Sequence, residues 1–196
     1  MITIIPTVGS NLNSICSALD RLALKWQISE ESKVITDSEK VILPGVGHAE
    51  TAMERLQSKG LDQTVRSLSQ LTLGICLGMQ LLFEESEEGS IPVPCLSLIP
   101  GKVKKIPSKP GISLPHMGWN QVRAAAASSY WQGNDLEDYY YFVHGYYCES
   151  GPWVKAVTDY VEAIPAIVEH KNFVGIQFHP EKSSRAGLEL LRSYLS

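Results

Sequence analysis

The chain lacks the sequence features that mark several protein classes. Its four cysteines lie far apart, at positions 16, 76, 95 and 148, and form neither a C-x-x-C pair nor a cysteine–histidine cluster of zinc-binding spacing. We therefore expect free thiols, a reducing compartment and no metal site. Long basic runs are also missing, and the net charge of -4 does not favour a nucleic-acid-binding surface.

No apolar run approaches the length of a membrane span, and residues 1–5 carry no positive side chain ahead of their apolar stretch. We expect a cytoplasmic protein that does not bind membranes. Internal repeats and low-complexity linkers are absent from the 196 residues. The sequence therefore predicts a single domain over residues 1–196, large enough to bury a substantial core.

The first half of the chain alternates short apolar runs with helical periodicity. Strands are predicted over residues 2–8, 34–35, 41–43 and 71–75, and helices over residues 12–26, 49–60, 61–68 and 77–85. This alternation indicates a parallel sheet covered by helices, in which ligands bind beyond the carboxyl ends of the strands. Loops 9–11 and 44–47 and the turn at Cys76 lie at such ends.

The second half has a different character. Prolines between residues 92 and 115 break up any long helix, and aromatic or β-branched runs follow. Strands are predicted over residues 102–106, 119–123, 139–147, 153–157, 166–169 and 173–178. Ser183 and Ser184 are expected to cap a closing helix. The sequence predicts an α/β fold whose mixed, mostly parallel sheet is flanked by helices, with a strand-rich second half.

Cys76 stands between two glycines, in the spacing G-x-C-x-G, where a predicted strand meets a predicted helix. This spacing is typical of a nucleophile elbow, a strained strand-to-helix turn that exposes its central side chain. The helix N-terminus favours a thiolate, and the N–H of Leu77 would face a forming oxyanion. The alternative is a buried structural cysteine, because free cysteines are often buried.

A cysteine nucleophile needs a base, and His179 is the best candidate among five histidines. It follows a predicted strand and precedes Glu181 by two residues, so that the carboxylate can orient the imidazole. The alternative is a turn histidine paired with a surface glutamate. His144, within an apolar strand, is expected to be a core histidine, whereas His116 is a somewhat stronger candidate for a functional role.

Loop 44–47 reads Pro-Gly-Val-Gly and ends a strand of the parallel type. On its own it is a tight turn. Beside a cysteine elbow, a backbone N–H of Val46 or Gly47 is the natural second donor to an oxyanion, together with the N–H of Leu77.

Five segments together carry a resemblance to a known family. They are GICLGMQLLFEESEEG (74–89), IPGKV (99–103), PHMGWN (115–120), YFVH (141–144) and QFHPEKS (177–183). The chain resembles the class I (triad) glutamine amidotransferases. Within that superfamily it is similar to the glutaminase subunits of imidazole glycerol phosphate synthase, an enzyme of histidine biosynthesis. The PHMGWN segment distinguishes these subunits from other amidotransferases.

The resemblance implies roles for individual residues. Cys76 would be the nucleophile, His179 the base and acid, and Glu181 the orienting carboxylate. The residues implied in glutamine binding are Gln80, Glu88, Gly145 and Tyr146. Those implied at a partner interface are Asn11, Trp119, Asn120, Tyr141 and Lys182.

The implied reaction is hydrolysis of glutamine through a γ-glutamyl thioester on the cysteine. The ammonia would pass to a cyclase subunit, a (β/α)8 barrel, in a heterodimer, and no cofactor or metal is implied. One rival is another cysteine hydrolase of the same fold, such as a γ-glutamyl peptidase or a glutaminase that feeds a different synthase, which segment 116–120 disfavours. A second is a non-catalytic binding module, which the intact cysteine, histidine and glutamate disfavour.

Overall fold

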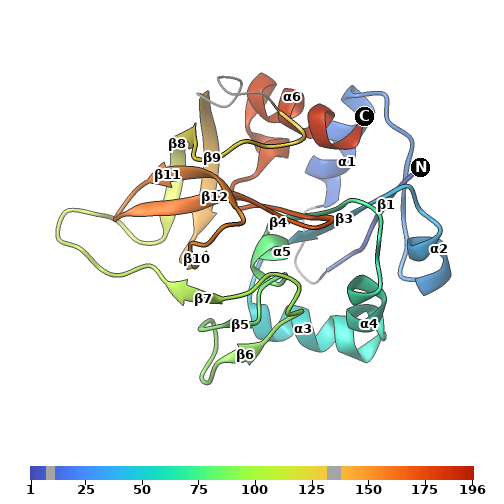
Figure 1. The fold of residues 1–196 in the computed structure, drawn as a ribbon, viewed down its shortest axis with the longest axis horizontal. Coiled ribbons are helices and arrows are strands. Elements are labelled where there is room, and N and C mark those ends of the chain that lie inside the picture. Colours follow the sequence, from blue (N-terminus) through green and yellow to red (C-terminus); the bar gives the residue numbers. More distant parts are fainter. Residues whose placement is uncertain (8–11, 132–137) are drawn as a thin grey trace.

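A nine-stranded mixed sheet runs through the molecule (Figure 1). The computed structural model describes residues 1–7, 12–131 and 138–196. Across the sheet lie β2 (Trp26–Ile28), β1 (Ile2–Ile4), β3 (Lys40–Gly45), β4 (Thr72–Cys76), β13 (Phe173–Ile176), β12 (Ala163–His170), β11 (Val154–Asp159), β8 (His116–Ala124) and β9 (Asp138–His144). The first five strands pair in parallel, and the others continue as antiparallel strands.

Helices cover both faces of this sheet, as Figure 1 shows. One face packs against α1 (Leu12–Arg21) and α6 (Ser184–Leu195), whose apolar sides include Leu19 and Leu191. The other packs against α3 (Ala49–Ser58) and α4 (Leu61–Arg66). Burial of apolar side chains on both faces drives formation of such a layered fold. The expected α/β fold with a mixed sheet flanked by helices is confirmed.

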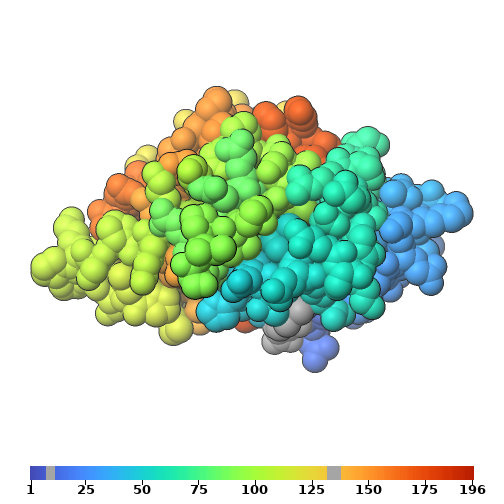
Figure 2. Space-filling view, turned by 90° about the horizontal axis from the view of Figure 1, so that it is seen from below, coloured from blue at the N-terminus to red at the C-terminus, as the bar shows by residue number. Residues whose placement is uncertain are grey.

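A four-stranded sheet lies beside α3 on the second face. Its order is β10 (Tyr146–Cys148), β7 (Lys102–Lys105), β5 (Glu85–Ser86) and β6 (Val93–Pro94). Figure 2 shows α3 and α4 (cyan) and the segment from β5 to β7 (green) as one continuous surface. The loop between β7 and β8 projects from the main body in both views.

Three neighbouring parallel strands deliver the candidate site. β3, β4 and β13 are adjacent and run in the same direction. The segments after their carboxyl ends are loop 44–47, the turn at Cys76, and the segment that contains His179. These groups therefore meet at one edge of the sheet, where ligands bind in open parallel sheets.

Several predicted boundaries are wrong. Helix α1 ends at Arg21, and Trp26 begins β2, a strand too short to show an alternating pattern. Residues 34–35 lie in a short helix, α2 (Ser32–Thr36), because two β-branched residues do not define a strand period. Helix α5 stops at Gln80, since the chain then turns so that residues 81–83 pack into the second core. The predicted strand 139–147 is divided at Gly145, and its halves join different sheets.

The four cysteines are free thiols, as expected. No helix within the described residues is long and apolar enough to cross a membrane. Loop 9–11, with its predicted interface residue Asn11, lies outside the described residues.

Candidate active site

Cys76 occupies a strained turn between β4 and α5 (Leu77–Gln80). Its backbone angles are φ 54° and ψ -112°, in a region that residues other than glycine rarely adopt. Such strain persists only where the surroundings enforce it, and it concentrates at functional sites. The geometry is that of the predicted nucleophile elbow.

The two glycines beside Cys76 allow the turn to pack tightly. A β-carbon added at Gly78 would lie 1.8 Å from the carbonyl oxygen of Leu43 in β3. One added at Gly74 would lie 2.6 Å from the carbonyl oxygen of Gly78. Both distances are far shorter than non-bonded contacts between carbon and oxygen atoms, so the G-x-C-x-G spacing reflects a steric requirement of this fold.

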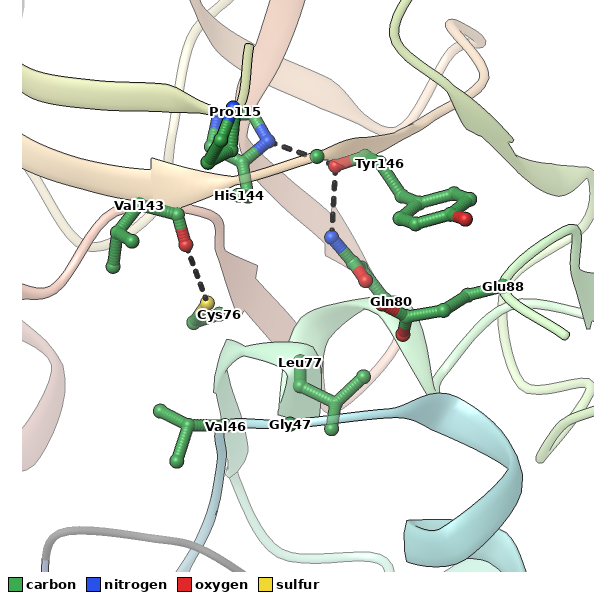
Figure 3. A pocket seen from close by; sticks show the side chains of 11 residues that line it. Val46, Gly47, Cys76, Leu77, Gln80, Glu88, Pro115, Val143, His144 and Tyr146 are labelled. Carbon is green, nitrogen blue, oxygen red and sulfur yellow. Dashed lines mark hydrogen bonds between the residues drawn. The ribbon is translucent and has the colours of Figure 1, made fainter.

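The thiol of Cys76 is nearly buried and only weakly held. Its exposed fraction is 6 %. Sγ lies 3.8 Å from the carbonyl oxygen of Val143 in β9 and 3.9 Å from Nε2 of Gln177. Figure 3 shows the sulfur directed toward Val143 at the wall of a cavity. These long contacts leave the sulfur available to a ligand.

His179 and Glu181 form a buried pair beside this thiol. Nδ1 of His179 lies 2.8 Å from Oε1 of Glu181, and the side chains are 3 % and 8 % exposed. Burial lowers the pKa of His179, but interactions with Cys76 and Glu181 outweigh it and raise the pKa to about 10. Nε2 makes no hydrogen bond to any described residue. Because Glu181 holds Nδ1, interaction with the sulfur is left to Nε2.

The backbone of His179 is fixed from two sides. Its N–H donates to the carbonyl of Tyr141 over 2.9 Å. Its carbonyl accepts from Oγ of Ser183 at 2.6 Å, and that Oγ accepts from the N–H of Tyr141 at 3.0 Å. Ser183 is the N-cap residue of α6, as expected, but its side chain makes no capping bond. Its hydroxyl is engaged by the histidine segment and the edge strand instead.

A cavity of about 260 Å³ opens in front of Cys76 (Figure 3). It is lined by Val46, Gly47, Cys76, Leu77, Gln80, Glu88, Pro115, Val143, His144, Gly145 and Tyr146. All the residues expected from the sequence to donate to an oxyanion or to bind glutamine are among them. The volume suits a ligand of amino-acid size.

Two polar side chains of the cavity are those of Gln80 and Glu88. Nε2 of Gln80 donates to the carbonyl of Tyr146 at 2.9 Å and to Oε1 of Gln177 at 3.0 Å. Oε2 of Glu88 accepts from the N–H of Ala49 at 2.9 Å. Burial raises the pKa of Glu88, while the bond from Ala49 lowers it. Glu88 also stands 3.6 Å from the exposed ring of His48, so a carboxylate faces the cavity mouth.

The histidines at 116 and 144 form one buried cluster. β8 and β9 pair them directly, and Nδ1 of His116 lies 3.0 Å from Nε2 of His144. His144 also bonds the carbonyl of Tyr146 at 2.8 Å and lines the cavity. Burial lowers the pKa of His116 to about 4 and, as the main cause, that of His144 to about 3. The expected core histidine is therefore hydrogen-bonded in the core.

The residues expected at a partner interface do not share one surface. Trp119 is 52 % exposed and contacts the half-buried Tyr141 across the β8–β9 pair, and Lys182 is also exposed. Asn120 projects to the opposite face, where its amide donates to the carbonyl of Asp159 at 3.0 Å. Trp119 and Tyr141 thus come together, whereas the side chain of Asn120 does not join them.

Sequence reasoning missed Gln177 and Ser183. Gln177 supports both Gln80 and the Cys76 sulfur, and Ser183 fixes the backbone of His179. A glutamine directly after an apolar run and two residues before His179 was an available signal. Nothing local in the sequence indicated the hydroxyl bonds of Ser183, since they depend on which strand forms the sheet edge.

Comparisons with known proteins agree with this geometry. The family model "Glutamine amidotransferase class-I" matches residues 6–195. "Imidazole glycerol phosphate synthase subunit HisH 2" of Legionella pneumophila is 44% identical over 196 residues, which cover 100% of this chain and 98% of that protein. "Imidazole glycerol phosphate synthase subunit HisH" of Pasteurella multocida is 43% identical over 194 residues, covering 99% and 96%.

Solved structures share the fold at much lower identity. One titled "Crystal structure of glutamine amidotransferase" has a TM-score of 0.73 and 16% identity, covering 98% of each chain. One titled "Structure of PurLQS from Thermotoga maritima" has a TM-score of 0.67 and 19% identity, covering 99% of this chain and 96% of that chain. Together with the family model and the curated relatives, these matches show that the chain belongs to the class-I glutamine amidotransferase family.

Proposed function

We propose that this chain is the glutaminase subunit of an imidazole glycerol phosphate synthase, hydrolysing glutamine to glutamate and ammonia for a cyclase subunit. The observation that carries the proposal is the elbow Cys76 beside the buried His179–Glu181 pair, at the wall of a cavity of amino-acid size. Relatives over 40% identical across nearly their whole length bear the names of such subunits.

The proposed reaction begins with the sulfur of Cys76. It attacks the side-chain carbonyl carbon of glutamine after its proton has passed to Nε2 of His179, whose raised pKa favours the protonated ring. His179 then gives a proton to the departing nitrogen, so that ammonia leaves and a γ-glutamyl thioester remains. Water, deprotonated by the same imidazole, hydrolyses the thioester to glutamate and restores the thiol. Glu181 holds Nδ1 and stabilises the imidazolium form throughout.

The tetrahedral intermediates need hydrogen-bond donors for their oxyanion. The N–H of Leu77, at the first position of α5, is one proposed donor. A peptide N–H of Val46 or Gly47 is the second, since both residues line the cavity opposite Cys76. Gly47 has φ +102° with no atom within 4 Å of an added β-carbon, so this loop has room to reorient its peptides. Each such donor contributes about 3 kcal/mol to transition-state stabilisation.

The remaining cavity residues suit the amino-acid part of glutamine. The Glu88 carboxylate would accept from its α-ammonium, an interaction of opposite charges within a partly buried site. Both hydrogen bonds of Gln80 come from Nε2, which leaves Oε1 without a described partner on a residue that lines the cavity. Gly145 and Tyr146 close the opposite wall and complete the proposed glutamine site.

A partner would dock on the aromatic face of the β8–β9 pair. Met117, Trp119 and Tyr139 are 62%, 52% and 55% exposed, and Tyr141 lies with them on the outward face. Contiguous exposed apolar side chains mark interaction sites. The proposed occupant is a (β/α)8 barrel cyclase, joined in a heterodimer with Lys182 at the rim, and it would receive the ammonia before it reaches solvent.

A steady-state assay of glutamate release tests this function. The purified chain is mixed with glutamine alone, with the cyclase subunit added, and with both the cyclase and its nucleotide substrate added. We expect slow hydrolysis by the isolated chain and the fastest hydrolysis in the complete mixture, because a reoriented loop 44–47 would then supply its donor. A chain that cleaves γ-glutamyl peptides but not glutamine in any mixture would be a different cysteine hydrolase.

A further inference from the structure

A chain of buried and partly buried hydrogen bonds joins β8 and β9 to the cavity, and the proposed reaction steps do not use it. It begins at Asn120, whose Nδ2 lies 3.3 Å from Nε2 of His116. Nδ1 of His116 then lies 3.0 Å from Nε2 of His144. Nδ1 of His144 lies 2.8 Å from the carbonyl oxygen of Tyr146, which faces the cavity.

The acceptor at its end fixes the direction of this chain. The carbonyl of Tyr146 can only accept, so Nδ1 of His144 carries a proton. Burial is the main cause that lowers the pKa of His144 to about 3. The ring is therefore neutral at physiological pH. Its Nε2 must then accept, and His116 donates from Nδ1. His116, with a pKa that burial lowers to about 4, is also neutral, and its Nε2 accepts from Asn120.

Asn120 is itself held in one orientation. Its Oδ1 accepts from the N–H of Gln121 at 2.8 Å, and its Nδ2 donates to the carbonyl of Asp159 at 3.0 Å. The amide nitrogen is therefore the group presented to His116. Every donor in the chain consequently points from Asn120 toward Tyr146, and no alternative tautomer satisfies both ends.

The carbonyl of Tyr146 also receives a hydrogen bond from the cavity side. Figure 3 shows His144 and Gln80 both bonded to this oxygen. Nε2 of Gln80 donates to it and to Oε1 of Gln177, whose own Nε2 is 3.9 Å from the Cys76 sulfur. The Tyr146 carbonyl oxygen and Oε1 of Gln177 therefore together determine which amide atom of Gln80 is turned to the ligand.

We infer that His116 and His144 are positioning residues of the glutaminase. They fix the carbonyl of Tyr146 so that Gln80 presents Oε1, an acceptor, to the bound glutamine. This inference rests on the proposed function, because it assigns parts of the same pocket. His144 acts on Tyr146 directly, and His116 acts by holding His144 in its tautomer.

If the role of His116 were purely structural, different substitutions would replace it well. Its ring stacks on Phe142 and on Tyr160, with centroid distances of 4.7 and 3.9 Å. If this stacking were its whole contribution, phenylalanine would replace it well and a small amide would not. If the hydrogen bond to His144 is what counts, the order is reversed, because an asparagine Nδ2 can stand where Nδ1 stands.

The test compares His116→Asn with His116→Phe in steady-state glutamine hydrolysis, with the cyclase subunit present. We expect His116→Phe to raise KM about three- to tenfold, the effect of one lost buried hydrogen bond, with a smaller change in kcat. His116→Asn should raise KM less than His116→Phe, although it loses the ring stacking. Thermal unfolding of both variants checks that they are folded. A KM that is higher in His116→Asn than in His116→Phe overturns the inference.

Histidine-selective ¹⁵N NMR of the wild-type chain tests the direction of the bonds without any activity. The inference predicts that both rings are neutral near neutral pH, with the proton on Nδ1 and an unprotonated Nε2. A proton on Nε2 of His144, or a charged ring, overturns it. Absence of glutamine hydrolysis in the wild type would instead refute the proposed function, and the tautomers would still report on the chain of bonds.

Discussion

The N–H of His179 donates to the carbonyl of Tyr141 over 2.9 Å, so the proposed catalytic base is bonded to an edge strand. That strand, β9, also carries exposed aromatic side chains proposed to meet the cyclase. A partner that shifts β9 therefore acts on the position of the imidazole through one backbone hydrogen bond. Ser183 reinforces the link, since its hydroxyl bonds both residues.

Replacing Ser183 by alanine should disturb this link. Ser183→Ala leaves the carbonyl of His179 and the N–H of Tyr141 without their hydroxyl partner, which should cost about 1–3 kcal/mol of unfolding free energy. We also expect kcat for glutamine hydrolysis to fall about tenfold or more, because a small displacement of a catalytic group lowers the rate strongly. The control is Ser184→Ala, at an exposed position one residue later. Equal effects of both substitutions would contradict the proposed link.

Removing the base should cost more than weakening its partner. His179→Ala is expected to lower kcat about 10² to 10⁴-fold, since it removes general acid–base catalysis. Glu181→Gln should lower it less, because an amide oxygen still accepts from Nδ1 but cannot stabilise the charged imidazole as a carboxylate does. Initial rates at saturating glutamine, on variants whose folding is verified by circular dichroism, compare the two. Equal losses would mean that Glu181 does more than orient the ring.

The elbow should not tolerate a side chain at Gly78. A β-carbon there would lie 1.8 Å from the Leu43 carbonyl, so Gly78→Ala must displace either β3 or the turn at Cys76. We expect loss of glutaminase activity and a destabilisation of several kcal/mol, on the order of the largest single-residue effects. Gly145→Ala is the control for stability, because its β-carbon would meet only Pro115 at 4.0 Å. A Gly78→Ala protein as stable as the control would disprove the close approach.

The site could be predicted because its chemistry is local in sequence. Cys76 is bracketed by two glycines, and His179 and Glu181 are two residues apart at the end of a strand. Parallel strands then bring such ends together without further information. The same logic placed loop 44–47 beside the cysteine.

Other features depend on pairing that no short pattern encodes. His116 and His144 touch only because β8 and β9 pair in one register, and the two strands are separated by a segment that includes residues 132–137, outside the described part. The predictions for the regions of helix α2 and strand β2 were wrong for another reason. The three-residue strand β2 and the five-residue helix α2 each contain less than two periods of their own pattern, so tertiary packing decides their conformation.

The buried histidines should make the protein sensitive to acid. The pKa values of His116 and His144 are lowered by burial to about 4 and about 3, below the ordinary value of 6.5 that unfolding restores. Between about pH 6.5 and pH 4 the unfolded chain binds protons that the folded chain does not, so the unfolding free energy falls as pH falls. The expected slope is up to about 1.4 kcal/mol per pH unit for each histidine.

Urea unfolding at about pH 7 and about pH 5 measures this slope, because between these pH values the unfolded chain protonates His116 and His144 and the folded chain does not. His116→Asn removes one of the two groups and should reduce the pH dependence. His48→Gln, at a ring that is 77% exposed, should leave it as it is in the wild type. If His116→Asn and His48→Gln give the same pH dependence, His116 does not titrate as described.

The most direct measurement compares two nitrogen sources for the cyclase reaction in a complex that carries Cys76→Ala. We expect this complex to form imidazole glycerol phosphate from added ammonium salt at nearly the wild-type rate. With glutamine as the only nitrogen source it should form none, because the substitution removes the nucleophile and little packing. Substantial glutamine-dependent product from the purified Cys76→Ala complex would contradict the central claim that ammonia is released through a thioester at Cys76.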